Sequence, residues 1–238
     1  MLNGRGAVVL VAALATAAGT ARLGLWQLDR AAEKQALHDA RQRQRALPPL
    51  NAAELARRPD EVPAQLHRSV DLQGTWLAAH TVYLENRQMN GRPGFFAVTP
   101  LRLGDGSAVL VERGWVPRDL LDRTRVAAPA PPAGAVQVQG RIAPGPGRLY
   151  EFAGAASGPI RQNLDIAAFA RETGLPLRPL SVVQEDGTVP AADGLLRQWT
   201  APAAGVQKHY GYAFQWFALS ALIIGLYAWF QLPRPRRA

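Results

Sequence analysis

The sequence contains no cysteine among its 238 residues. Without thiols it forms no disulfides, no Cys-ligated zinc sites and no CxxC redox centres, and it cannot carry copper on thiolates. Methionine occurs only at Met1 and Met89, which argues against a Met-rich copper site. The four histidines show no metal-ligand spacing; they are His38, His67, His80 and His209.

The common enzyme motifs are also missing. HExxH, GxSxG, P-loop and GxGxxG patterns do not occur, and none of the five serines lies in a nucleophile elbow. The acidic pairs Asp60-Glu61 and Glu185-Asp186 fall in turn-like stretches, where such pairs are usually solvated. The sequence therefore favours a non-enzymatic protein. A membrane-tethered enzyme stays an alternative, because catalytic groups can converge from distant strands.

Negative charge is absent from both ends of the chain. All 18 acidic residues lie between Asp29 and Asp193, whereas the formal net charge is +9 and the pI is about 10.9. This distribution indicates membrane topology rather than nucleic-acid binding, so we expect no nucleic-acid partner. Six basic residues flank or touch the apolar ends: Arg5, Arg22, Lys208, Arg234, Arg236 and Arg237.

The first of two long apolar runs covers residues 7–25 and is interrupted only by Arg22, which can snorkel toward the interface. Trp26 follows it, as an aromatic-belt residue would. A helix needs about 20 residues to cross the hydrocarbon core, so this run just suffices. A cleaved signal peptide is the alternative, because Arg5 resembles an n-region and residues 15–17 resemble a cleavage site.

The second apolar run covers residues 212–232 and is followed by a basic tail, which marks the cytoplasmic side. Arg5 does the same for the N-terminus, and the basic residues after the first run lie in a connection long enough to escape this rule. We expect membrane lipids around both spans. The predicted order is a cytoplasmic N-terminus (1–6), a first span (7–26), an external periplasmic domain (27–211), a second span (212–232) and a cytoplasmic tail (233–238).

Three stretches of the external domain predict helices. Residues 27–47 contain no Gly or Pro, and a helix should run out of the first span until Pro48-Pro49 ends it. Residues 52–58 suit a short helix. Residues 165–173 suit a capped helix that ends at Gly174.

The remainder of this domain alternates with the period of β-strands. The GDG turn predicts a hairpin, whereas RQMNGRPG (87–94) reads as a turn-rich connection and APAPPAG (128–134) as an exposed loop. Hairpins without a repeating βαβ rhythm indicate an α+β domain dominated by an antiparallel β-barrel or sandwich. The predicted strands are 70–74, 80–86, 95–103, 108–116, 136–142 and 180–184.

Two loop stretches combine glycine with residues that often anchor interfaces. Asn86 and Arg87 lead into Gly91 and Gly94, and the segment 112–117 reads ERGWVP. One interpretation is turn chemistry with an aromatic ring packed on an arginine stem. The other is a partner-facing surface, because arginine and tryptophan concentrate binding energy; its anchors would be Arg87, Arg113 and Trp115.

The stretch KHYGYAFQWF (208–217) crowds aromatics and one imidazole at the start of the second span. His209 lies where the positive end of the helix dipole favours a neutral imidazole, which is the form that binds metal. Haem iron commonly takes an axial histidine, and Lys208 could reach lipid headgroups or haem propionates. The alternative is a plain interfacial histidine within an aromatic belt that includes Tyr210, Tyr212 and Trp216.

Several motifs in the same order resemble the signatures of the Surfeit-locus-one family, whose yeast members are called Shy-type. The resemblance runs from the first span to the second and so covers nearly the whole chain. It is carried by GLWQLDR (24–30), ENRQMNGRPGFFAVTPL (85–101), LVERGWVP (110–117), RQNLD (161–165) and KHYGYAFQWFAL (208–219).

This resemblance implies a two-span inner-membrane protein that assists assembly of haem-copper cytochrome c oxidase, with an uncleaved first span. Bacterial relatives are associated with haem a, carried toward the catalytic subunit, and haem a synthase is a second partner to consider. A bacterial source is expected, and a cofactor-free scaffold is the alternative. The resemblance makes His209 the candidate iron ligand, and Tyr212 and Trp216 are the neighbouring aromatic residues expected to line the haem ring. The implied motif or partner surface comprises Trp26, Gln27, Asn86, Arg87, Gly91, Gly94, Arg113, Gly114 and Trp115.

Overall fold

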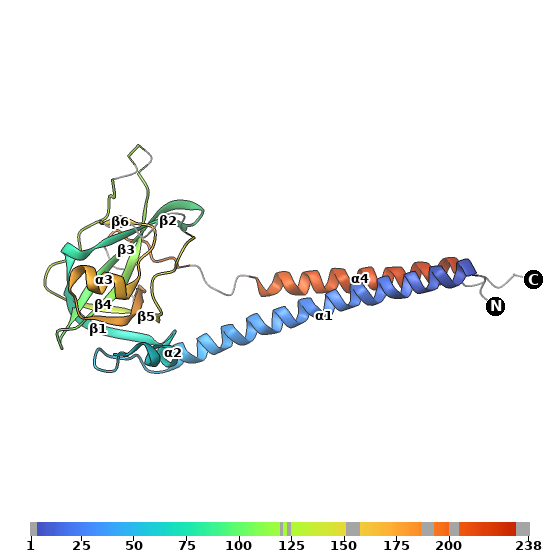
Figure 1. Ribbon diagram of the computed structural model, residues 1–238, viewed down its shortest axis with the longest axis horizontal. Helices are drawn as coiled ribbons and strands as arrows, with labels where there is room; N and C mark the ends of the chain where they lie inside the picture. The colour runs from blue at the N-terminus through green and yellow to red at the C-terminus, as the bar shows by residue number, and fades with distance from the viewer. Residues whose placement is uncertain are drawn as a thin grey trace, which may run out of the picture. The chain divides into compact units, whose positions relative to one another are not determined.

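The computed structural model describes residues 4–119, 121–122, 125–150, 158–186, 193–199 and 205–231 (Figure 1). The chain divides into two compact units. One is a helical unit from residues 1–40 and 201–238, and the other is a β-rich unit from residues 41–200.

Two long helices, α1 (Gly4–Ala46) and α4 (Val206–Gln231), make up the helical unit. Each is long and apolar enough to cross a membrane. The prediction that residues 27–47 continue the first apolar run as one helix is confirmed, and α1 ends just before Pro48. The helix α4 begins six residues before the apolar run that was predicted to span.

The β-rich unit contains a closed barrel. Strand β1 pairs with β5 on one side and with the end of β3 on the other, which closes the order β1-β5-β7-β4-β3 into a ring. Strands β2 and β6 extend this sheet from β3. The strands are β1 (Ser69–Trp76), β2 (Val82–Met89), β3 (Arg92–Leu103), β4 (Ala108–Pro117), β5 (Ala135–Ala143), β6 (Ile160–Arg161) and β7 (Leu177–Gln184).

The predicted domain dominated by an antiparallel barrel or sandwich is confirmed as a barrel whose strand pairings are mostly antiparallel, and two pairings depart from this prediction. Strand β7 runs parallel to β4, and β6 runs parallel to β2. A parallel neighbour needs a long connection, which here includes β5 and the helix α3 (Ile166–Thr173). The helix itself is confirmed: the Ala168 amide donates to the Asp165 side chain, and Gly174 ends the helix in the left-handed conformation.

Two local predictions were wrong. Residues 87–94 were expected to connect two strands as a loop, but β2 continues to Met89 and β3 begins at Arg92. Asn90 and Gly91 form a two-residue turn with positive φ angles of 52° and 73°, which suits a hairpin. The helix expected over residues 52–58 is replaced by turns, followed by η1 (Pro59–Glu61) and α2 (Val62–Gln65).

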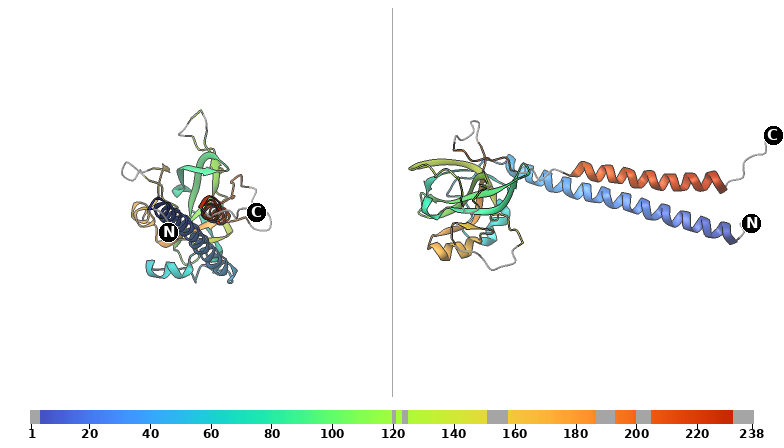
Figure 2. Two further views of the ribbon diagram at one scale, coloured as in Figure 1. Left: turned by 90° about the vertical axis from the view of Figure 1, so that its right-hand side faces the viewer. Right: turned by 90° about the horizontal axis from the view of Figure 1, so that it is seen from above.

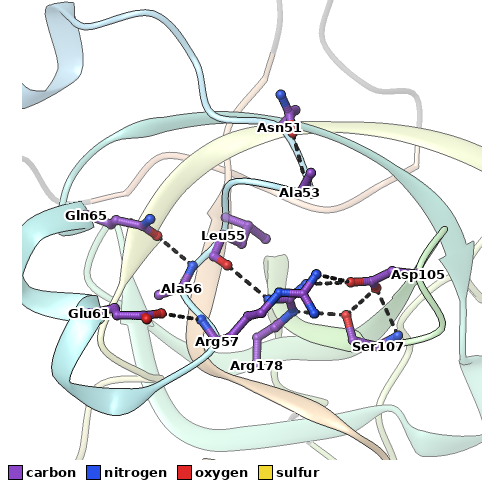
Figure 3. A network of polar contacts seen from close by, with 10 residues as sticks. All are labelled: Asn51, Ala53, Leu55, Ala56, Arg57, Glu61, Gln65, Asp105, Ser107 and Arg178. Carbon is purple, nitrogen blue, oxygen red and sulfur yellow. Dashed lines mark hydrogen bonds and ion pairs between the residues drawn. The ribbon is translucent and has the colours of Figure 1, made fainter.

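A polar network holds residues 51–65 against the turn between β3 and β4 (Figure 3). Arg178, on β7, is buried and donates to the Leu55 carbonyl at 3.0 Å and to Asp105 at 2.6 Å. Gln65 accepts from the Ala56 amide at 2.9 Å. The segment thereby places Leu55 against the barrel core, which also contains these residues: Leu50, Ala56, Val62, Val70, Leu72, Trp76, Leu101, Leu103, Val109, Val111, Val138, Ile142, Leu180 and Val182.

Candidate functional site

The helices α1 and α4 lie side by side (Figures 1 and 2), and the least exposed side chains of each recur at alternating spacings of three and four residues. This spacing defines a continuous packing face, which we call the seam. On α1 most of its residues are small, which lets helix backbones approach closely. The seam consists of Leu10, Ala13, Ala17, Thr20, Gly24, Gln27 and Ala31 on α1, and Val206, His209, Ala213, Trp216, Ser220, Ile223 and Tyr227 on α4.

Two contacts fix the antiparallel register of the seam. The Ser220 hydroxyl donates to the Ala17 carbonyl at 2.9 Å. Gly24 lies so close to α4 that a Cβ atom added there would stand 2.7 Å from the Phe217 ring. The glycine of the motif GLWQLDR therefore lets the Phe217 ring pack directly on the α1 backbone.

The motif histidine and the motif glutamine meet across the seam. His209 Nδ1 and Gln27 Oε1 are 2.7 Å apart, although 182 positions separate them in the sequence. Both side chains are half-buried. The contact occupies one ring nitrogen, and Nε2 has no hydrogen-bond partner among the described residues.

The structure brings the three predicted haem residues together along α4. His209, Tyr212 and Trp216 follow one another at spacings of three and four residues, so they are neighbours on the helix surface. Trp216 is partly buried in the seam, whereas Tyr212 is 50% exposed. An imidazole beside two aromatic side chains is a donor set that suits an apolar, planar iron complex.

The sequence contains only two lysines, and both lie near the start of α4. Lys208 is exposed in the first turn of the helix. Lys34 reaches across from α1, with its Nζ atom 3.4 Å from the position of a Cβ added to Gly205. Our sequence analysis missed Lys34; the scarcity of lysine was the signal that could have found it.

In the β-rich unit the sequence motifs pack against one another. Trp115 is 1% exposed, and its indole N–H donates to the Arg87 carbonyl at 2.9 Å. Gly94 makes room for this ring, because an added Cβ would lie 2.4 Å from the indole and 2.2 Å from the Val116 carbonyl oxygen. We call Asn86, Arg87, Gly94, Arg113, Gly114 and Trp115 the motif cluster.

Asn86 and Arg87 occupy an irregularity in the pairing of β2 with β3. Asn86 has a positive φ of 58°, a conformation that asparagine tolerates better than most residues. Arg87 is buried; its guanidinium donates to the Gln162 carbonyl at 2.8 Å and lies 5.8 Å from the Phe96 ring centroid. Burial lowers the pKa of this guanidinium below its usual range.

Arg113 and Gly114 hold the segment 193–199 against β4. Arg113 is buried over the Trp76 ring at 5.2 Å and lies 3.6 Å from the Asp193 carboxylate. The backbones of Trp115 and Leu196 exchange two hydrogen bonds, of 2.8 and 2.9 Å. A side chain at position 114 would collide with this segment, because an added Cβ would lie 2.7 Å from the Leu195 Cβ.

These contacts support the packing interpretation for Arg87, Arg113 and Trp115, since all three are buried. The partner role of the motif residues stays a prediction. Trp26 on α1 is 48% exposed, and Asn86 in β2 and Gly91 in the β2–β3 turn are also exposed, so these three are the accessible members of that set.

Glu112 is a buried acid that our sequence analysis left without a role. Its carboxylate lies 3.5 Å from the Ser181 hydroxyl. Burial raises the pKa of Glu112 from 4.5 to about 7, although Arg141 and Arg87 act in the opposite direction. The sequence feature that could have identified Glu112 is its place as a lone acid inside the apolar strand AVLVERGWV.

A groove of about 740 Å³ lies beside α3, and its lining is mostly apolar. Its charged lining residues are Arg57, Arg148 and Asp165, of which Asp165 caps α3 and Arg57 pairs with Asp105 at 3.0 Å. Within the described ranges no three His, Cys, Asp or Glu side chains are grouped for a metal ion. The groove gives no argument for the tethered-enzyme alternative.

Fold and motifs together define a class of protein: a β-barrel domain that lies, in sequence, between two candidate membrane helices. A sequence model of the SURF1 family matches residues 14–221, so the chain belongs to this family. It is 26% identical over 211 residues to a SURF1-like protein of Rickettsia bellii, covering 86% of this chain and 83% of the relative. It is also 26% identical over 210 residues to a SURF1-like protein of Rickettsia felis, covering 86% and 88%.

Proposed function

We propose that this chain is an assembly factor for haem-copper cytochrome c oxidase that carries haem a as cargo toward the catalytic subunit. Family membership supports the assembly role. The observation that carries the haem role is the half-buried His209, which has Nδ1 engaged by Gln27 at 2.7 Å and Nε2 without a partner in the described part of the chain.

The surroundings of His209 suit haem a. Tyr212 and Trp216 offer aromatic faces beside the imidazole. Lys208 and Lys34 place positive charge near the start of α4, where propionates could be held by charge-assisted hydrogen bonds. When haem is bound, its iron would accept His209 Nε2 as a nitrogen ligand.

In the proposed arrangement α1 and α4 cross the bacterial inner membrane, with both termini in the cytoplasm. The β-rich unit is then periplasmic. Two features support this: two helices of sufficient length and a basic tail after the second apolar run. A tag at the C-terminus should be accessible only from the cytoplasm.

The test is purification of the full chain from cells that synthesise haem a. We expect a Soret band for the wild type, its loss in His209→Ala and its retention in His80→Ala. His80 is a matched control, because it lies in η2 (Ala78–His80) of the β-rich unit. The absence of the band from the wild type, or its persistence in His209→Ala, would overturn the haem role.

A cofactor-free scaffold is the second candidate, and the buried motif cluster is consistent with it. A scaffold requires the folded barrel but no imidazole. It predicts that oxidase activity in cells falls when Trp115 is disrupted, while His209→Ala leaves that activity unchanged. Haem transport predicts a loss in both variants.

A further inference from the structure

The contact between Gln27 and His209 has a chemical consequence beyond helix packing. We propose that Gln27 is a positioning residue that holds His209 in the tautomer protonated at Nδ1, so that Nε2 presents its lone pair to an iron ligand site. This inference rests on the proposed haem function. It assigns Gln27 a role in controlling the ligand rather than in contacting a partner.

The first step is the direction of the hydrogen bond. Gln27 meets the ring through Oε1, which accepts but cannot donate. With the amide in this orientation, His209 Nδ1 is the donor. A neutral imidazole has only one N–H, so Nε2 is left unprotonated and able to bind a metal.

The second step concerns the rigidity of this pair. Gln27 and His209 stand on different helices, and their separation depends on the register of the seam. Gly24, three residues before Gln27, packs against Phe217 without space for a Cβ atom. The bond from Ser220 to Ala17 fixes the register further along the helices. The imidazole is thus oriented by a packed element and not by a loop.

The acceptor in this pair is an amide and not a carboxylate. Histidines that bind metals usually donate their second N–H to a carboxylate, a carbonyl or a water, which sets ring orientation and basicity. Gln27 lies directly after the first apolar run, and the first acidic residue is Asp29. An uncharged acceptor supplies the same hydrogen bond without burying a charge near the membrane.

The direct test is nitrogen NMR of the full chain in detergent micelles, labelled with ¹⁵N-histidine and free of haem. Only four histidines contribute signals, and a His209→Gln sample identifies those of His209. We expect a protonated Nδ1 and an unprotonated Nε2 in the wild type. In Gln27→Leu the Nδ1-protonated form should give way to a mixture of tautomers.

The second readout is titration of the same samples with hemin, followed by its Soret band. We expect Gln27→Leu to weaken hemin binding by about 10- to 100-fold, the usual effect of losing the partner of a metal-bound histidine. Gln215→Leu is the matched control, because Gln215 is an exposed glutamine on α4. It should alter neither the tautomer nor the affinity.

Each outcome decides the question. If His209 is protonated at Nε2 in the wild type, or if Gln27→Leu leaves its tautomer or its hemin affinity unchanged, the positioning role is overturned whatever the wild type binds. If the tautomer behaves as expected but the wild type binds no hemin, the proposed haem function fails, and the ligand role of Nε2 fails with it.

Discussion

The helical unit and the β-rich unit use their motif residues in opposite ways. In the β-rich unit the motif side chains contact one another: Trp115 donates to the Arg87 carbonyl, and Arg113 lies between Trp76 and Asp193. In the helical unit Gln27 contacts His209 through Nδ1, and the other ring nitrogen, Nε2, has no partner among the described residues. The first arrangement builds a fold, and the second leaves a group available for chemistry.

This difference shows that the motif residues of one chain can have different roles. Arginine, tryptophan and glycine in the barrel are explained by close packing at the pairing irregularities of β2, β3 and β4. Substitutions there should act on stability, and through it on the amount of folded protein. Under the proposed haem function, substitutions at His209 should act on haem binding while the fold is retained.

The largest expected effect tests the packing of the motif cluster. Gly94→Ala adds a Cβ only 2.2 Å from the Val116 carbonyl oxygen and 2.4 Å from the Trp115 ring, and the backbone atom cannot move aside freely. We expect the free energy of unfolding to fall by about 3 kcal/mol. Denaturant unfolding of the full chain in detergent, followed by near-UV circular dichroism, measures this loss.

Gly104→Ala provides the control for this substitution. No atom lies within 4 Å of a Cβ added at position 104, so its effect should stay within about 0.5 kcal/mol. Equal stabilities for the two variants would refute the claim that the motif glycine is required by packing.

The next effect depends on pH and concerns Glu112, the buried acid beside the motif cluster. Its pKa is about 7 in the folded chain and 4.5 in the reference state, so the folded protein holds a proton that the unfolded chain releases. The stability from this group is complete below pH 4.5, is lost as the pH rises to about 7 and is constant above that. Glu112→Gln should match the wild type near pH 4.5 and exceed it by up to about 3 kcal/mol at pH 8.

Glu172→Gln is the control with the opposite sign. Its pairing with Arg161 lowers the pKa of Glu172, so its contribution is present above the unfolded pKa and is lost on acidification. Unfolding of the full chain from pH 4.5 to 8 should therefore show the two variants diverging from the wild type in different directions at high pH. Parallel profiles for Glu112→Gln and the wild type would contradict the buried-acid interpretation.

Much of the fold could be predicted from the sequence because its signals are local. The GDG turn gave the β3–β4 hairpin, and Asp165 with Gly174 gave the ends of α3. The parallel pairing of β7 with β4 could not be predicted, because it depends on which distant strands meet. The Asn90-Gly91 hairpin was missed although its signal is local, because the flanking residues were read as a loop.

In the candidate site, too, local features could be predicted from the sequence and contacts between distant segments could not. His209 is marked by its neighbours in sequence, so the aromatic stretch was enough to single it out. Its contact with Gln27 spans the two helices and follows only from the seam register. The burial of Arg87 and Trp115 is equally non-local, since Gly94 and the β2 irregularity create the space that they fill.

The smallest expected effect tests the seam itself. Ser220→Ala removes the hydroxyl that donates to the Ala17 carbonyl on the other helix. Such bonds between membrane helices contribute about 0.6 kcal/mol, because alternative partners exist in the unfolded state. Thr16→Ala is the control, since the Thr16 hydroxyl bonds to Ala12 in its own helix. In unfolding titrations with dodecyl sulfate, Ser220→Ala should lower the stability of the helical unit slightly and Thr16→Ala should not. A loss as large as that of Gly94→Ala would mean that the seam depends on this bond rather than on its small residues, and the contrast between the two units would fail.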